Sequence, residues 1–195
     1  MARRLTQRGK DRREQLMTFA ATRFAEQGYH PTSVSEIVAG LGVGKGVFYW
    51  YFDSKEQLFL EILKDAQQDL RRRQQQAIGD EADPVQRIVL GLRASMAWAE
   101  AHRDLNKLIQ FAATETTFQT ALRRGADIAA ADVVKHVKEA IAQGRIRDTD
   151  PELVAQAMVG VVSHLTRVFI YERGEAADKI ADDAVAFCLE GLSPA

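Results

Sequence analysis

Cysteine, proline and strand-forming patterns are all scarce in this chain, and each of these scarcities excludes a class of structure or site. Among its 195 residues there is a single cysteine, Cys188, so an internal disulfide is excluded and no cysteine pair can bind a metal. A reducing, cytoplasmic setting fits that count. The four prolines stand where helices begin or end, and apolar residues recur at helical spacing rather than in alternation. The sequence therefore predicts an all-α fold.

A secretory signal is also missing, because the basic first residues, MARRLTQRGKDRREQ, are followed by no apolar run. The most apolar stretch, Leu153 to Tyr171, carries Gln156, His164 and Arg167, which would be costly inside a bilayer. We interpret this stretch as a buried helix. We expect a cytoplasmic protein without a membrane partner.

The net charge of −1 hides an uneven distribution. Residues 1–55 hold nine Lys/Arg and five Asp/Glu, giving +4, and the remaining residues hold seventeen and twenty-two, giving −5. A basic N-terminal part on an acidic body favours contact between that part and a polyanion. Charge alone is equally compatible with a solubilising tail.

Helix-ending and helix-capping signals divide the chain into helical segments. Gly28 is placed to end the first helix, and Ser33 with Glu36 forms a capping box for the second. Asp150 and Pro151 have the cap and first-turn positions of a later helix. We expect helices over residues 11–27, 34–41, 45–52, 55–77, 84–101, 103–113, 117–143, 151–172 and 175–192.

The short helices over residues 34–41 and 45–52, joined by a tight turn at Gly42, have the layout of a helix-turn-helix. The second of them contains five consecutive aromatics, FYWYF. Phe48 and Phe52 are four residues apart, so we expect both to face the core. Tyr49 and Trp50 then face outward.

The outward surface of this second helix suits DNA. Lys45 is a ligand for a phosphate or a guanine edge, and Gly46 leaves the backbone bare for close approach. Val47 can touch a thymine methyl, and the Tyr49 hydroxyl can donate to a phosphate. Lys55 stands at the start of the next helix, where its charge and the helix dipole both favour an anion.

Residues 12–63 resemble the DNA-binding domain of TetR-type transcriptional regulators. The resemblance is carried by Phe24 with GYHPTSVSEIV, by GVGKGVFYWYF and by SKEQLFLEIL. This chain departs from the family pattern at two positions. Gly44 stands where the family usually has serine or threonine, and Val47 stands where threonine is common. The first departure removes a helix cap and a phosphate donor.

The resemblance implies which residues touch DNA and how the chain is divided. Residues 1–10 would form a basic flexible arm, whose Arg3, Arg4 and Arg8 could reach phosphates or a minor groove. Residues 11–54 would form the DNA-binding domain, and the helix over 55–77 would link it to a ligand-binding and dimerisation domain over 55–195. The implied DNA contacts are Thr32, Ser33, Lys45, Gly46, Val47, Tyr49, Trp50, Tyr51 and Lys55.

The resemblance further implies a homodimer formed by the last two helices, which would present two recognition helices to a palindromic operator in double-stranded DNA. An inducer, a small and partly apolar molecule, would bind the C-terminal domain and release a repressor from DNA. Candidate ligand contacts are Met96, Trp98, His102, Phe111, Phe118, Met158, His164 and Arg167. No cofactor and no metal site is expected.

Three alternatives remain open. A transcriptional activator would have the same fold. A helical adaptor could use the aromatic face for a protein partner, although the basic N-terminal part argues against it. An enzyme is disfavoured, because no glycine-rich phosphate loop, nucleophile elbow, paired carboxylate motif or zinc motif is present.

Overall fold

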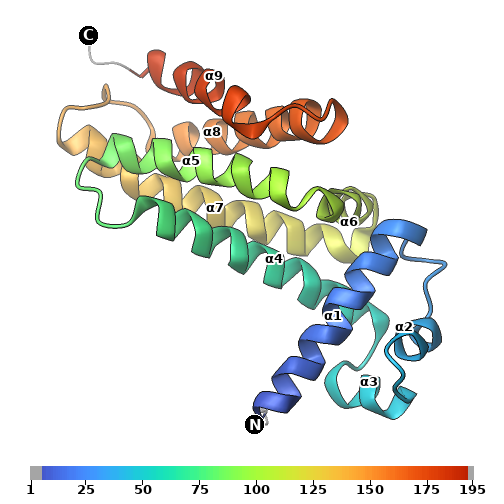
Figure 1. Cartoon of the computed structure of the whole chain (residues 1–195). Coiled ribbons are helices and arrows are strands. Elements are labelled where there is room, and N and C mark those ends of the chain that lie inside the picture. Colours follow the sequence, from blue (N-terminus) through green and yellow to red (C-terminus); the bar gives the residue numbers. More distant parts are fainter. Residues whose placement is uncertain (1–5, 193–195) are drawn as a thin grey trace. The chain divides into compact units, whose positions relative to one another are not determined.

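In the computed structural model, which describes residues 6–192, every regular element is helical (Figure 1). The predicted all-α fold is confirmed. The elements are α1 (Gln7–Gln27), α2 (Val34–Gly40), α3 (Lys45–Tyr51), α4 (Lys55–Ile78), α5 (Pro84–Ala101), α6 (Arg103–Thr114), α7 (Thr116–Ala142), α8 (Pro151–Leu165), the π-helix η1 (Thr166–Glu172) and α9 (Ala177–Glu190).

The first helix begins at Gln7, earlier than the predicted Asp11, because Thr6 caps it. The Thr6 hydroxyl accepts a hydrogen bond from the Gly9 amide at 3.2 Å. Gln7–Lys10 therefore belong to α1 and not to an arm, which corrects the predicted arm over 1–10. The predicted arm contacts of Arg3 and Arg4 lie outside the described residues.

Other helix ends follow the predicted signals. The Ser33 hydroxyl accepts from the Glu36 amide and the Glu36 carboxylate accepts from the Ser33 amide, so the capping box is confirmed. Asp150 caps α8 as expected. The predicted helix over 151–172 has the right extent, but its last seven residues, Thr166–Glu172, are wound as a π-helix. The apolar pattern of the sequence predicts a helix there but does not indicate its change of winding.

The chain folds as two compact units that do not follow the predicted boundary at residue 54. Unit 1 comprises residues up to Ala66 together with Asp104–Leu122, and unit 2 comprises Gln67–Arg103 together with Arg123 onward. The segment Asp104–Leu122 belongs to unit 1 because its side chains pack in the same core, where Phe111 and Phe118 contact Tyr29 and Phe59.

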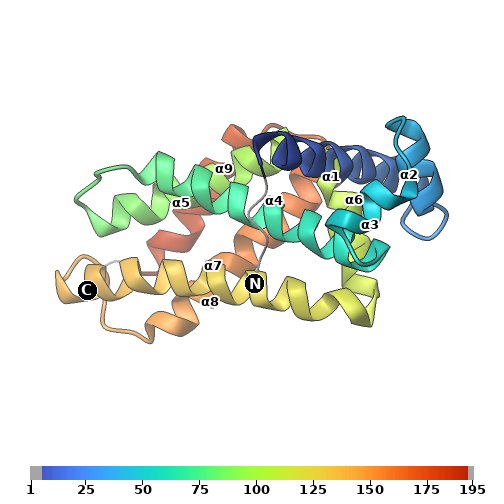
Figure 2. The same cartoon turned by 90° about the horizontal axis from the view of Figure 1, so that it is seen from below.

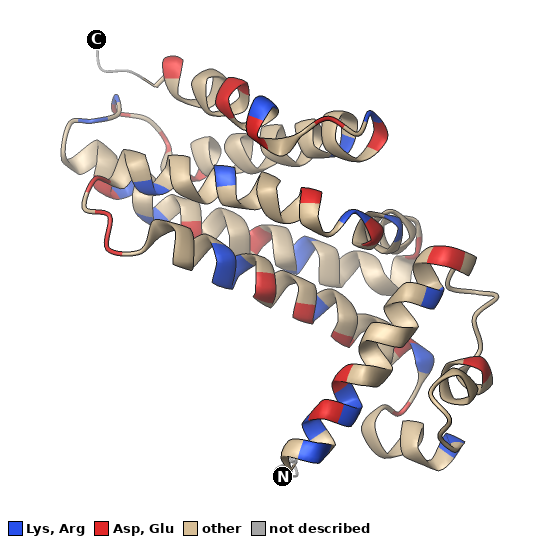
Figure 3. Ribbon diagram, viewed as in Figure 1, with Lys and Arg blue, Asp and Glu red and all other residues tan. Residues whose placement is uncertain are grey.

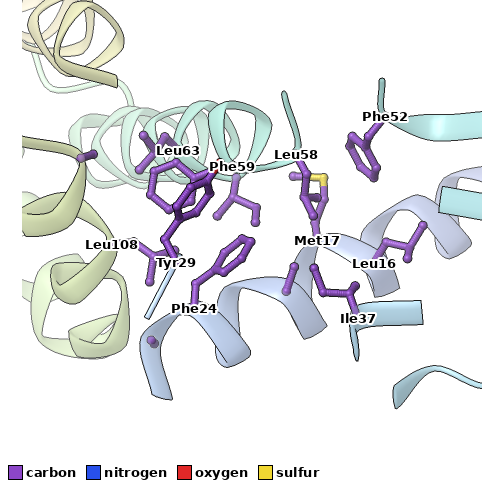
Figure 4. Close-up of a cluster of buried hydrophobic side chains, with 14 of the residues drawn as sticks. Leu16, Met17, Phe24, Tyr29, Ile37, Phe52, Leu58, Phe59, Leu63 and Leu108 are labelled. Carbon is purple, nitrogen blue, oxygen red and sulfur yellow. The ribbon is translucent and has the colours of Figure 1, made fainter. Parts of the chain in front are cut away.

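The core of unit 1 contains aromatic rings from α1, α3, α4, α6 and α7 and from the loop after α1, and Figure 4 shows several of them. Phe59 of α4 lies with its ring centroid 4.5 Å from that of Phe118 of α7. Tyr29, in the loop after α1, stacks on Phe111 of α6 at 5.0 Å. Such ring contacts add to the free energy gained from burial. The helices α1 to α3 thus share one core with α6 and the start of α7.

Unit 2 has its own core, in which α5 packs against α9 and α8 (Figures 1 and 2). Its buried side chains include Ile88, Leu92, Met96, Val137, Met158, Ile170, Ile180 and Ala184. The stretch Pro151–Glu172 is long and apolar enough to cross a membrane by length and composition alone, with a mean hydropathy of 1.6. One face of that stretch is buried in unit 2, whereas Leu153 on the other face is 66% exposed. The helix that the sequence predicts to be buried therefore has one buried face and one exposed face in the single chain.

The connection between η1 and α9 is held by two side chains at the junction of α5 and α6. Arg103 donates hydrogen bonds to the main-chain oxygens of Ile170 and, at 3.2 Å, Glu175. The Glu100 carboxylate accepts a hydrogen bond from the Ala177 amide at 3.1 Å. The N-cap residue of α9, Ala176, forms no side-chain cap of its own. These bonds satisfy helix-end groups that would otherwise be left unpaired.

We predict that Arg103→Met lowers the free energy of unfolding by about 2 kcal/mol, because part-buried carbonyls lose their donor. Urea denaturation at neutral pH measures the change. The matched control is Arg93→Met, which removes an exposed ion pair between α5 and α9, Arg93 to Asp182 at 2.5 Å, but uncaps no helix. Equal losses in the two variants would contradict this role of Arg103.

Candidate nucleic-acid interface

The helix α3 is anchored in the core of unit 1 by Phe48, which lies within the helix, and by Phe52, which directly follows it. Phe48 and Phe52 are 0% and 1% exposed, so the prediction that both face the core is confirmed. Tyr49 and Trp50 are 55% and 50% exposed, which confirms that both face outward. Tyr51 is half-buried and packs against the unit 1 core. Large exposed aromatics on adjacent positions are unusual on a surface with no partner.

The turn before α3 is set by glycine. Gly42 has a φ of 64°, in the left-handed region that side chains disfavour, and its amide donates to Ala39 at 3.0 Å. The Val43 amide donates to Val38 at 2.9 Å and closes the turn. This geometry brings α3 back across α2, which is the helix-turn-helix arrangement.

Two further glycines in this region have no structural reason to be glycine. Gly44, the N-cap of α3, has an ordinary φ of −83° and forms no side-chain cap. A Cβ atom added at Gly44 or at Gly46 would meet nothing within 4 Å. Gly46 lies inside α3, where glycine costs about 1 kcal/mol relative to alanine, whereas Gly44 precedes the helix. A bare surface kept at that cost indicates a partner that approaches the backbone of α3 closely.

Lys55 serves the protein itself. Its ammonium group donates to the main-chain oxygens of Tyr29 and Thr32, each at 2.9 Å, and of His30 at 3.4 Å. It also lies 4.2 Å from the centroid of the Tyr29 ring. Burial lowers the pKa of Lys55 below its ordinary value. Since an ammonium has three N–H donors, these bonds compete with the predicted phosphate contact.

The side chain of Thr32 is used within the fold, so DNA contact by this residue stays a prediction only for its main chain. Its side chain is 0% exposed, and its hydroxyl donates to the Gly28 oxygen at 2.8 Å. A phosphate therefore cannot reach this hydroxyl in the folded unit. Ser33 is exposed, and its hydroxyl accepts from the Glu36 amide, which leaves the hydroxyl proton available to a phosphate. Lys45 is exposed on α3, whereas Val47 is half-buried, and DNA contact by either residue stays a prediction.

An open groove of about 550 Å³ lies beside α3 within unit 1. Its lining residues come from the start of α1, from the turn and from α3: Thr6, Arg8, Gly9, Arg12, Val43, Gly46, Val47, Trp50 and Tyr51. Arg12 is absent from the predicted site. The sequence signal for Arg12 is its spacing of four residues from Arg8. This spacing places the two arginines on one helix face, because α1 already begins at Gln7.

Comparison with known proteins identifies the family. The model for bacterial regulatory proteins of the tetR family matches residues 16–62, the stretch that holds α2 and α3. The transcriptional repressor KstR2 of Mycolicibacterium smegmatis is 30% identical over 198 residues, which cover 93% of this chain and 91% of KstR2. The chain belongs to the TetR family. It is a transcriptional regulator with a DNA-binding helix-turn-helix, and not an enzyme.

Solved structures of TetR-family regulators share the fold. A putative regulator from Syntrophomonas wolfei superposes with a TM-score of 0.81 at 20% identity, over 92% of this chain and 93% of that one. AibR, in complex with isovaleryl coenzyme A and operator DNA, superposes with a TM-score of 0.68 at 23% identity, over 90% of this chain and 97% of AibR.

The predicted ligand contacts of this TetR-family regulator do not gather at one place. Phe111 and Phe118 lie in the unit 1 core against Tyr29 and Phe59, which gives them a packing role. The other six candidates lie in unit 2. Ligand contact by any of the eight stays a prediction.

Within unit 2 the remaining candidates have different surroundings. Met96 and Met158 are buried in the same core. The Trp98 indole N–H donates to the Asp69 carboxylate at 2.7 Å, and the His102 ring stacks on Trp98 at 4.4 Å. The hydrogen bond to Trp98 holds the pKa of Asp69 below its usual value. His164 and Arg167 are exposed on the surface of α8 and η1.

We predict that Gly46→Ala stabilises the regulator and weakens DNA binding at the same time. The methyl group raises the helix propensity of α3 by about 0.5–1 kcal/mol and meets no neighbour in the fold. Thermal unfolding and duplex binding measure the two effects. The matched control is Gly91→Ala in α5, where a Cβ makes an ordinary contact of 3.7 Å with Ile78. Unchanged DNA affinity in Gly46→Ala would contradict close approach at α3.

We predict that Lys55→Met lowers the free energy of unfolding by about 2 kcal/mol, because part-buried loop carbonyls lose their donor. Lys64→Met is the control, since Lys64 makes only an exposed pair with Glu61 at 3.7 Å. Urea denaturation and the salt dependence of DNA binding are measured together. Unchanged stability with a reduced salt dependence would show that Lys55 is mainly a phosphate ligand.

Proposed function

We propose that this regulator is a repressor that binds a palindromic operator as a homodimer and is released by a small-molecule inducer. The observation that carries the DNA part is the surface of α3. Exposed Tyr49 and Trp50 stand beside Lys45 and a glycine backbone that the fold itself does not require. These groups match what a helix needs for entering a major groove.

The dimer part is supported by apolar side chains exposed on α8 and α9. Leu153 is 66% exposed and Phe187 is 71% exposed, the highest values among the exposed large apolar residues of the described chain. Exposed apolar area of this kind is stabilised by a partner. A second copy of the chain supplies the same face, and the two-fold symmetry of such a pair matches a palindromic operator.

The ligand part is supported by unit 2 and by two relatives. KstR2 is a repressor by name, and AibR is solved with an acyl coenzyme A and operator DNA. We propose that unit 2 of this regulator binds a partly apolar molecule and forms the dimer, while unit 1 binds DNA in the cytoplasm. An activator with the same architecture is the second candidate, because the DNA surface is the same in both cases.

Selection of binding sites from random duplexes with the purified regulator tests the DNA part. We expect inverted repeats to be enriched and affinity to fall steeply as salt rises. Tyr49→Ala should lower affinity about tenfold or more, whereas Ile128→Ala, an exposed apolar change on α7, should leave it unchanged. Affinity that stays flat as salt rises would overturn the proposal.

Sedimentation of Phe187→Asp tests the dimer part. A charge in a buried apolar interface is costly, so this variant should be a monomer at concentrations where the wild type is a dimer. Ile128→Asp adds the same charge to α7 and should leave the dimer intact. A dimer that persists in both Phe187→Asp and Leu153→Asp would show that α8 and α9 do not form the interface.

A further inference from the structure

The groove beside α3 joins two helices that are far apart in the sequence. Arg8 and Arg12 of α1 line this groove together with Trp50 and Tyr51 of α3. Gly46 also lines the groove and contributes no side chain to it. Figure 3 shows basic positions recurring along the first turns of α1. The groove thus combines cations, flat rings and open space.

The two arginines of the groove differ from their neighbours on α1. Arg13 pairs with Glu61 at 2.7 Å, and Arg23 lies 3.4 Å from Glu26. Within residues 6–192, no such acidic partner is found for Arg8 or Arg12. One helical turn separates Arg8 from Arg12, so both guanidinium groups can face the same occupant. Their charges are therefore free to bind an anion.

The aromatic wall has an exposed ring in position to meet that occupant. Trp50 is 50% exposed and contacts Tyr51 edge-on, with ring centroids 4.5 Å apart. This contact with the half-buried Tyr51 restricts how Trp50 can turn. A fixed indole face packs well on a flat, partly apolar group such as a sugar ring. An occupant with alternating anionic and partly apolar groups fits these walls.

We propose that this groove holds the sugar-phosphate backbone of one operator strand. Arg8 and Arg12 bind phosphates, and Trp50 packs against the deoxyribose next to them. The proposal rests on the proposed function, because the same strand passes the outward face of α3. Arg12 is then a positioning residue. It sets the register of α3 in the major groove and reads no base, since phosphate contacts position a protein and base contacts specify the sequence.

This role predicts a change in binding that is independent of DNA sequence. Each phosphate contact that is lost should reduce the slope of log affinity against log salt by about 0.9. The Arg12→Gln variant should therefore lower affinity for a selected operator and for a scrambled duplex by the same factor, about 3- to 10-fold at moderate salt. The ratio of the two affinities should stay as in the wild type.

The experiment compares four proteins on both duplexes at several salt concentrations. They are the wild type, Arg12→Gln, the double variant Arg8→Gln/Arg12→Gln and the control Arg73→Gln, which removes an exposed charge from α4 in unit 2. Because a dimer carries each substitution twice, we expect slope reductions of about 1.8 in the single variant and about 3.6 in the double variant. Arg73→Gln should keep the wild-type slope, and all variants should unfold at the wild-type temperature.

Two outcomes would overturn the proposal. A wild-type slope in the double variant would show that no phosphate is bound in the groove. Loss of affinity for the operator alone would show that Arg12 reads a base. If the wild type itself shows no salt-dependent duplex binding, the proposed function fails before the groove is tested, so the two failures are distinguishable.

Discussion

The geometry of the DNA-binding unit depends on the ammonium group of Lys55. By binding the carbonyls of Tyr29 and Thr32, it ties the loop after α1 to the first turn of α4. That loop leads directly into the capping box that starts α2. The position of α2, and through the glycine turn that of α3, follows from a few polar contacts between segments that are distant in the sequence. A buried carbonyl without a donor is costly, so the loop has little freedom to rearrange.

In this unit, the residues that stabilise the fold differ from those on the outer face of α3. Phe48 and Phe52 anchor α3 from inside, and aromatic rings of α6 and α7 complete the core. The outer face of α3 has features that the fold does not need, namely two glycines in open space and two exposed aromatic rings. Residues that weaken a helix without serving the core are expected where a protein meets its partner.

In the second unit too, side chains form hydrogen bonds with main-chain groups at helix ends that are distant in the sequence. Arg103 and Glu100 close the end of η1 and the start of α9, which lie more than sixty residues further along the chain. The chain enters the first unit at Asp104, directly after Arg103. The same short segment therefore caps the exposed α8–α9 pair and begins the part of the chain that completes the DNA-binding core.

Local signals in the sequence determined the helices, their caps and the inward and outward aromatics of α3, because each depends on residues within about one turn. The family was visible for the same reason, since its motifs are contiguous. Contacts between distant segments were decided only by the tertiary structure. The burial of Thr32, the use of Lys55 as a loop brace and the packing of Phe111 and Phe118 in the DNA-binding unit all rest on neighbours that sequence spacing does not reveal. Arg12 lies between these cases, because its helical spacing is local while the groove that it faces exists only once α1 and α3 have packed together.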